Sequence, residues 1–155
     1  MKKFLIFEDK IEENMDLFLE HFSGLSSEDC YFRFLHSVNL GSIRDWLLGL
    51  KNSKDLNMFF VVSEDEKVAS LCQLSINQET KTAEIAISTL PEFRGRGLAK
   101  VAIEDAIDSA KSLNVKEVIF MCDPFNRSCR TLFRKLKFVM KYSIEEEVEI
   151  GRKFI

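Results

Sequence analysis

Proline, histidine and tryptophan are scarce in this sequence. Its 155 residues contain two prolines, two histidines and one tryptophan, and no stretch is rich in proline, glycine or serine. Linkers between domains usually show such a stretch, and there is no internal repeat that would indicate an array of modules. We therefore expect one domain over residues 1–155. With 46% apolar residues, the chain can bury a core of its own.

A strong charge of either sign is also lacking. The 22 Lys and Arg residues are nearly balanced by 25 Asp and Glu residues, which gives a net charge of −3. No basic stripe is present that could neutralise nucleic-acid phosphates or dock on anionic lipid. The apolar run near the N-terminus, Phe4 to Phe7, is far shorter than a signal-peptide core or a membrane span. We expect a cytoplasmic protein with neither nucleic acid nor a membrane as partner.

The cysteines and histidines lack the spacing of a metal site. No two of the four cysteines form a C-x-x-C pair, and neither His21 nor His36 lies at ligand spacing from one. We expect reduced thiols in and around the core, and no metal. Both histidines lie among apolar residues of the N-terminal third, where a packed or surface histidine is the usual case, so neither is assigned a role.

Hydrophobic periodicity divides the chain into three parts. A short strand at 2–7 precedes helical spacing at 11–22, a helix cap at 26–29 and helical stretches through 31–35 and 43–50. Strand-like runs follow at 58–62, 68–76 and 82–89, with connections short enough for an antiparallel meander. The last part reads as a helix over 98–114, a strand over 118–122, a helix over 126–136 and strands over 138–142 and 148–155. This order predicts an α+β (α/β) fold.

The sharpest motif is the glycine-rich turn between the 82–89 strand and the helix that follows it. Helix N-termini present unpaired N–H groups and a partial positive charge, so they attract anions. Gly95 and Gly97 let the backbone approach an anion closely, while Arg94 and Arg96 can add charge-assisted contacts. The turn therefore predicts a pyrophosphate site. The alternative is a plain helix cap with two surface arginines.

Two common phosphate motifs are excluded at this turn. A Walker loop requires G-x-x-x-x-G-K-[ST], which is absent. The dinucleotide motif G-x-G-x-x-G requires a third glycine where Lys100 stands. Kinase and dehydrogenase functions are therefore disfavoured.

The segment from Phe59 to Phe138 resembles the GNAT acetyltransferase superfamily. Residues 94–99, Arg-Gly-Arg-Gly-Leu-Ala, match its motif [Q/R]-x-x-G-x-[G/A] at every specified position. Asn126 and the Leu-Lys-Phe ending at Phe138 occupy the place of its downstream landmarks, with Lys137 where a glycine is usual. The resemblance implies a mixed central sheet of six to seven strands, an antiparallel N-terminal meander, splayed fourth and fifth strands, and about four helices.

The resemblance also implies acetyl-CoA as co-substrate and no metal. In this family the pantetheine arm bonds to the main chain of the fourth strand, and the pyrophosphate lies on the turn and the helix N-terminus. Asn126 would contact the arm, although a role as N-cap is sufficient to explain it. The implied cofactor residues are Ile87, Ser88, Thr89, Arg94, Gly95, Arg96, Gly97, Leu98, Ala99, Lys100 and Asn126.

Glu84 is the candidate catalytic residue. An amine must be neutral to attack a thioester, and a lysine-like amine is almost fully protonated at pH 7. Residues 82–86, Thr-Ala-Glu-Ile-Ala, look like the Ala-Glu-x-Ala segment of Pat-like bacterial protein-lysine acetyltransferases, whose glutamate is the base. The alternative is a glutamate on the solvent face of a strand. The Tyr that protonates the leaving thiolate in many GNAT enzymes is replaced by Phe133, with Tyr142 or Cys129 as weak substitutes.

The resemblance implies transfer of an acetyl group to a primary amine by direct attack in a ternary complex. Protein lysine is the first acceptor considered, because residues 25–34 also look like a stretch that precedes the catalytic core in Pat-like proteins. Small amines remain open, and so does a monomer or a homodimer. A non-catalytic acyl-CoA sensor would keep the turn and lose the chemical groups. A structural domain that binds nothing is the third alternative.

Overall fold

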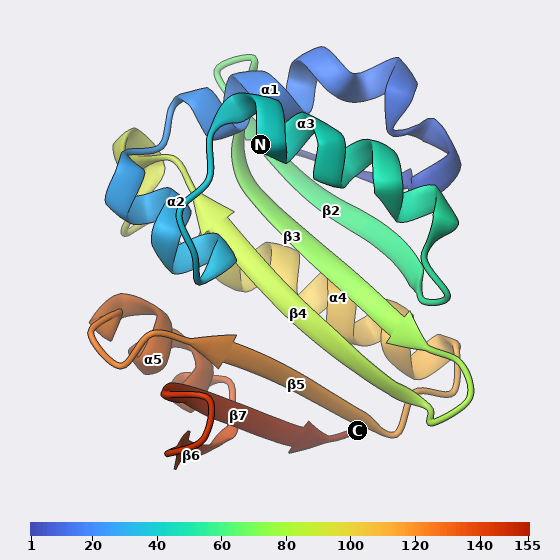
Figure 1. Cartoon of the computed structure of the whole chain (residues 1–155), viewed down its shortest axis with the longest axis vertical. Coiled ribbons are helices and arrows are strands. Elements are labelled where there is room, and N and C mark those ends of the chain that lie inside the picture. Colours follow the sequence, from blue (N-terminus) through green and yellow to red (C-terminus); the bar gives the residue numbers. More distant parts are fainter.

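The computed structural model describes all of residues 1–155. Its centre is a seven-stranded sheet in the order β1-β2-β3-β4-β5-β7-β6 (Figure 1). The strands are β1 (Lys2–Phe7), β2 (Leu56–Glu64), β3 (Lys67–Asn77), β4 (Thr82–Thr89), β5 (Glu117–Cys122), β6 (Val139–Ser143) and β7 (Val148–Phe154). The helices are α1 (Met15–Ser23), α2 (Ser27–Phe34), α3 (Leu40–Gly49), α4 (Leu98–Ser112) and α5 (Arg127–Lys135). The expected α+β class and mixed sheet are confirmed, with five α-helices where about four were expected.

Two apolar clusters lie on opposite faces of the sheet. In Figure 1, α1 and α3 cover the front face and α4 lies behind it. The front cluster packs apolar residues of α1 and α3, such as Phe18 and Leu47, against Phe59 of β2. The back cluster packs the alanine stripe of α4 against β2, β3, β4 and β5. Leu113, expected in that stripe, is 43% exposed, because α4 ends one residue earlier.

The helical N-terminal third differs from expectation at two points. Residues 8–14 form two 3-10 turns and α1 begins at Met15 rather than near Ile11. Ile11 is still only 2% exposed. Its position in the apolar pattern therefore predicted correctly that it is buried, but not the type of helix around it. Gly24 follows α1 with an ordinary φ of −80°. A Cβ on Gly24 would lie 2.7 Å from Leu90 Cδ2, so glycine is required there for close approach.

The start of α2 agrees with the sequence. The Ser26 side chain accepts a hydrogen bond from the Asp29 N–H at 3.0 Å, and the Asp29 carboxylate accepts one from the Ser26 N–H at 3.2 Å. This reciprocal pair is a capping box, which satisfies two donors that would otherwise be unpaired at the helix start. It fixes where α2 leaves the loop after α1, and so fixes the position of α2 beside β4.

The pairing of β4 with β5 is parallel and short. It covers three residue pairs, from Thr82 with Glu117 to Glu84 with Ile119, while β3 pairs with β4 along its whole length. Beyond Glu84 the two strands diverge, and Figure 1 shows the widening between them. The splayed fourth and fifth strands expected from the sequence are therefore present. No helix is both long and apolar enough to cross a membrane.

Candidate functional site

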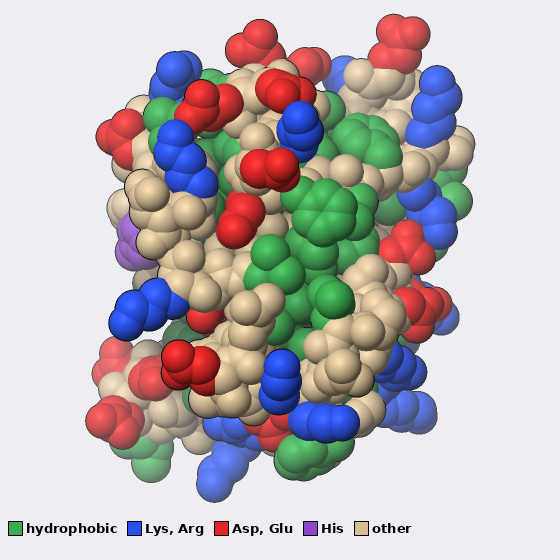
Figure 2. Space-filling model, turned by 90° about the vertical axis from the view of Figure 1, so that its right-hand side faces the viewer, with side chains coloured by type: hydrophobic (Ala, Val, Ile, Leu, Met, Phe, Trp, Pro, Cys, Tyr) green, Lys and Arg blue, Asp and Glu red, His purple; other side chains and the backbone are tan.

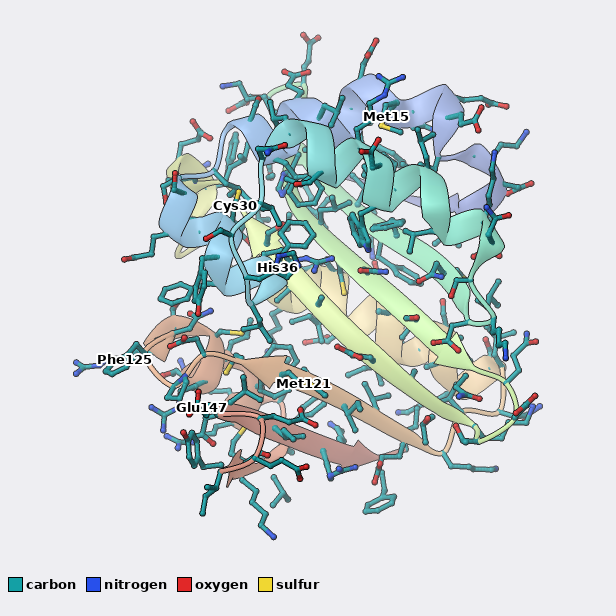
Figure 3. The ribbon with its side chains drawn as sticks, in the orientation of Figure 1. Met15, Cys30, His36, Met121, Phe125 and Glu147 are labelled. Atoms are coloured by element: carbon teal, nitrogen blue, oxygen red, sulfur yellow. The ribbon has the colours of Figure 1, made fainter.

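A cleft of about 900 Å³ opens where β4 and β5 separate. Its walls come from α2, β4, the glycine-rich turn, β5 and the start of α5. In Figure 3, Cys30 on α2 and Met121 on β5 lie on opposite sides of the opening. Ten of the residues expected to bind cofactor line this cleft: Ile87, Ser88, Thr89, Arg94, Gly95, Gly97, Leu98, Ala99, Lys100 and Asn126. Arg96 and Glu84 do not.

The glycine-rich turn has the backbone that an anion site requires. Gly95 has φ of +78° and Gly97, the N-cap of α4, has φ of +77°, a region that favours glycine. No side chain caps α4, so its first N–H groups have no partner within the helix. A Cβ added at either glycine would meet no atom within 4 Å. Both glycines therefore border open space in front of the N–H groups, and a pyrophosphate fits there.

The two arginines of the turn are held by protein atoms. Arg94 donates to the Thr89 carbonyl oxygen through Nε at 3.2 Å and Nη2 at 3.0 Å, and it pairs with Asp29 at 3.0 Å. Arg96 donates to the Glu92 carbonyl oxygen at 3.3 Å. Arg94 therefore joins the turn to α2 and β4 in addition to facing the cleft. Burial tends to raise the pKa of Asp29, but hydrogen bonds from Arg94 and Ser26 outweigh it and hold that pKa below its ordinary value.

Alternation along β4 decides which main-chain groups face the cleft. The Leu90 N–H donates to the Ala69 carbonyl oxygen on β3 at 2.8 Å. Main-chain groups two residues earlier, at Ser88, therefore also face β3, while those of Ile87 and Thr89 face the side of β5. With β5 diverging, these groups are open to an extended ligand, although Arg94 already occupies the Thr89 carbonyl oxygen.

Asn126 is the N-cap of α5. Its Oδ1 accepts a hydrogen bond from the Cys129 N–H at 3.3 Å and one from the Ser128 hydroxyl at 3.4 Å. The expected capping role is confirmed. Because Asn126 also lines the cleft, its amide nitrogen is available to a ligand there.

Glu84 lies at the last residue pair before the strands separate. Its neighbours Ala83 and Ile85 are 2% and 1% exposed in the back cluster, whereas Glu84 is exposed on the opposite face. The alternation expected from the sequence is confirmed. Desolvation raises the pKa of Glu84 above its ordinary value, Arg33 opposes this shift, and Asp55 and Glu146 add to it. Glu84 is thus a carboxylate with raised proton affinity where β5 leaves β4, beside the cleft rather than in its lining.

The position of the usual general acid holds a buried aromatic ring. Phe133 is 1% exposed and stacks on Phe120, with ring centroids 3.5 Å apart. Tyr142 lies on β6, outside the cleft lining, whereas Cys129 lines the cleft. The Cys129 thiol donates a hydrogen bond to Cys122, and this bond together with burial raises the pKa of Cys129 well above its ordinary value. Cys129 is therefore protonated at neutral pH.

Two polar residues near the cleft were missed from the sequence. His21 is 1% exposed and contacts Ser88 on β4, and Arg33 of α2 lines the cleft and contacts Gln73 on β3. His21 was read as a packed residue with no role. Arg33 lies in segment 25–34, which looks like a stretch of Pat-like proteins, and this likeness was the only feature of the sequence that could have identified Arg33. Their partners are 67 and 40 residues away, so no local pattern reports these contacts.

The face shown in Figure 2 has no large patch of charge of one sign. Acidic and basic side chains alternate around a central apolar area there. No group of three or more His, Cys, Asp or Glu side chains is placed to hold a metal ion. The features that distinguish this molecule are thus the split sheet, the glycine-rich turn and the carboxylate where β5 leaves β4.

Comparison with known proteins finds acetyltransferases that are similar in sequence and in fold. The chain is 32% identical to spermidine N(1)-acetyltransferase of Escherichia coli K12 over 97 residues, which are 61% of this chain and 52% of that protein. The match thus spans about half the length of that relative. The structure superposes on the GNAT domain of S. lividans PAT with a TM-score of 0.74 at 16% identity, covering 99% of this chain and 89% of the other.

A second solved structure has a similar fold. Ribosomal-protein-alanine N-acetyltransferase from Brucella melitensis superposes with a TM-score of 0.67 at 12% identity, with all of both chains covered. At these identities the two structures show a shared fold. The family model described as Acetyltransferase (GNAT) family matches residues 11–138, which is most of the chain. This protein belongs to the GNAT acetyltransferase family.

Proposed function

We propose that this protein is an N-acetyltransferase that moves the acetyl group of acetyl-CoA to a primary amine, with Glu84 as the base. One observation carries the proposal. A single strand, β4, has Glu84 at the point where β5 leaves it, then five residues that diverge from β5, then the turn into α4. A base beside the cleft, an open strand edge and an anion site thus follow one another along one strand and the turn after it.

The residues of the cleft fit acetyl-CoA, which supplies an activated acyl carbonyl and a thiolate leaving group. The main chain of Ile87 and Thr89 would pair with the pantetheine arm as with an added strand. The N–H groups at the start of α4, with Gly95 and Gly97, would hold the pyrophosphate. Asn126 would donate its amide N–H to the arm while its oxygen caps α5.

Glu84 would remove the proton that blocks attack. An amine with pKa near 10.4 is about 3.4 units from neutrality at pH 7, which corresponds to roughly 4.6 kcal/mol. A carboxylate with a raised pKa is a stronger base than an ordinary glutamate, so desolvation of Glu84 suits this role. Arg33 keeps the carboxylate ionised by opposing that rise.

The names of the similar proteins suggest polyamines and N-terminal amines as acceptor classes, and the Pat-like segments of the sequence suggest protein lysine. A non-catalytic acyl-CoA sensor is the second candidate. It is favoured by Phe133, which fills the position of the usual proton donor with a stacked ring.

The proposal is tested by release of free thiol from acetyl-CoA, measured against a panel of amines for the wild type, Glu84→Gln and Glu79→Gln. Glu79 is an exposed glutamate in the turn before β4 and serves as the control. We expect Glu84→Gln to lose about 10²-fold or more in kcat with unchanged CoA affinity, and Glu79→Gln to match the wild type. Because the base must be ionised, the wild-type rate should fall as pH drops through the raised pKa of Glu84. Tight CoA binding without turnover of any amine would support the sensor instead.

A further inference from the structure

Arg33 is a cation on the wall of the cleft that faces the sheet. It belongs to α2, and its guanidinium carbon lies 4.7 Å from the centre of the Phe34 ring and 5.3 Å from that of Trp46. Its Nη2 donates to Gln73 Oε1 at 2.7 Å. Burial lowers the pKa of Arg33 to about 10, which leaves it positively charged at neutral pH.

No carboxylate lies within ion-pair distance of Arg33. Two other arginines in or near the cleft are paired: Arg94 with Asp29 at 3.0 Å and Arg130 with Glu149 at 3.3 Å. The only side chain that accepts a hydrogen bond from Arg33 is the neutral amide of Gln73. Desolvated charges in proteins are usually paired. Arg33 therefore carries an uncompensated positive charge.

The free donors of Arg33 remain accessible. The one buried polar side-chain atom without a partner in the structure is Nε of Arg130. No nitrogen of Arg33 is buried without a hydrogen-bond partner. Only one of its nitrogens, Nη2, donates to Gln73. Because Arg33 lines the cleft, its remaining N–H groups can reach a ligand there.

A chain of hydrogen bonds fixes the position of the guanidinium. Gln73 Nε2 donates to Asn57 Oδ1 at 3.0 Å, which orients the Gln73 oxygen toward Arg33. Asn57 Nδ2 donates to the Asp55 carbonyl oxygen at 3.2 Å, and the Asn57 N–H donates to Glu8 Oε2 at 3.0 Å. The two aromatic contacts hold the guanidinium plane as well. The cation is thus positioned before any ligand arrives.

Arg33 and Glu84 lie on the same face of the sheet. Gln73, which holds Arg33, pairs with Ala86, and the next residue of β3 on that face, Ser75, pairs with Glu84. Diagonal neighbours of this kind are roughly 7–8 Å apart. The two charges influence each other electrostatically without forming an ion pair within 4.0 Å.

We propose that the acceptor is a primary amine with a carboxylate close to the amine, and that Arg33 binds this carboxylate while Glu84 takes the amine proton. The inference rests on the proposed function. The nitrogen forms a C–N bond to the acetyl carbon, the C–S bond breaks with its electron pair on the thiolate, and the amine proton moves to Glu84. A free amino acid and a peptide whose amine adjoins an acidic side chain share this chemistry.

A polyamine fits this arrangement poorly. Its second ammonium group would approach Arg33, and like charges repel in a partly desolvated site. Asp55 and Glu146 also act on Glu84, but neither lines the cleft. The cationic group that does line the cleft at this point is Arg33.

The test compares amines that differ in the carboxylate alone. One arm uses alanine and alaninamide, and the other uses peptides whose N-terminal residue is followed by Asp or by Asn. Each kcat/KM is calculated with the concentration of the neutral form of the amine, because loss of the carboxylate changes the pKa of the amine. Spermidine completes the panel. The proteins are the wild type, Arg33→Met, Arg33→Lys and the control Arg44→Met, an exposed arginine on α3.

We expect the wild type to prefer the carboxylate member by at least about tenfold in kcat/KM. The preference should collapse in Arg33→Met, survive in part in Arg33→Lys and persist in Arg44→Met, with CoA affinity unchanged. The arm with the larger preference identifies the source of the carboxylate. A purely structural role for Arg33 would lower both members of a pair equally and leave their ratio unchanged, which would overturn the inference.

The wild type alone also decides the question if Arg33→Met fails to fold. Propionate should inhibit turnover competitively against the amine, and propionamide should not. Equal rates for the two members of each pair, or a preference for spermidine, would overturn the inference while leaving the acetyltransferase intact. CoA binding without turnover of any amine would instead remove the proposed function, and this inference with it.

Discussion

His21 connects α1 to the strand that forms the cleft. Its Nε2 lies 2.8 Å from the Ser88 hydroxyl oxygen, and its Nδ1 lies 2.7 Å from the Val68 carbonyl oxygen. A carbonyl can only accept, so Nδ1 carries the proton and Nε2 accepts from the Ser88 hydroxyl. Burial lowers the pKa of His21 to about 4, so the imidazole is neutral at neutral pH in this arrangement. Ser88, whose main chain faces β3, is thereby also tied to α1 through its side chain.

The neutrality of His21 predicts an acid-sensitive contact. Burial lowers the pKa of His21 to about 4, although the hydrogen bond to Val68 opposes the shift. The folded pKa is below the ordinary value of about 6.5, so the unfolded chain binds the proton first. The stabilisation is therefore full above that ordinary value and is lost as pH falls from about 6.5 toward 4, by up to on the order of 3 kcal/mol.

The measurement is thermal unfolding of the wild type, His21→Gln and His36→Gln between pH 8 and 4.5. Gln at position 21 can donate to Val68 and accept from Ser88, yet it does not titrate. We expect His21→Gln to be less stable than the wild type at pH 8 and to lose that deficit as pH falls. His36 is exposed, so its variant should follow the wild type. Parallel curves for all three proteins would refute a buried neutral His21.

Gly95 and Gly97 should matter for CoA binding more than for folding. Ala at either position has room but must adopt a positive φ, which costs roughly 1 kcal/mol. The added methyl group occupies the space in front of the α4 N-terminus, so we expect CoA affinity to fall by about tenfold or more. Gly49→Ala is the matched control.

Gly49 also has nothing within 4 Å of an added Cβ, and its φ is −77°. Ala is therefore unstrained there, and we expect slightly higher stability with unchanged CoA affinity. Calorimetric titration with CoA and thermal unfolding separate the two effects. Full CoA affinity in both Gly95→Ala and Gly97→Ala would mean that the turn is only a helix cap.

Local signals in the sequence predicted most of the cleft. Gly95, Gly97 and Asn126 belong to turns and caps, whose geometry depends on a few neighbouring residues. The alternation around Glu84 depends on the strand period of two, and it predicted the face on which that side chain lies. These features follow from short stretches of chain, and a single sequence contains them.

The acceptor side could not be predicted in the same way. Arg33 contacts Gln73 of β3 only because α2 packs beside β4, the next strand, and His21 contacts Ser88 of β4 only because α1 packs over β3. Nothing in the period of either helix identifies its partner strand. The start of α1 differs from the sequence-based expectation for a related reason. Ile11 lies between the two 3-10 turns, and it is buried by tertiary packing rather than by being part of an α-helix.

Cys129 is the remaining proton donor in the cleft, and we expect it to be dispensable. Its thiol stays protonated at neutral pH because the hydrogen bond that it donates to Cys122 and burial raise its pKa. A leaving thiolate with an ordinary pKa of about 8.5 departs without a proton donor, unlike an alkoxide. We therefore expect Cys129→Ala to lower kcat by less than about threefold, well below the roughly 10²–10⁴-fold effect of removing a general acid. A loss of about 10²-fold with unchanged CoA affinity and thermal stability would instead assign Cys129 the role that Phe133 cannot fill.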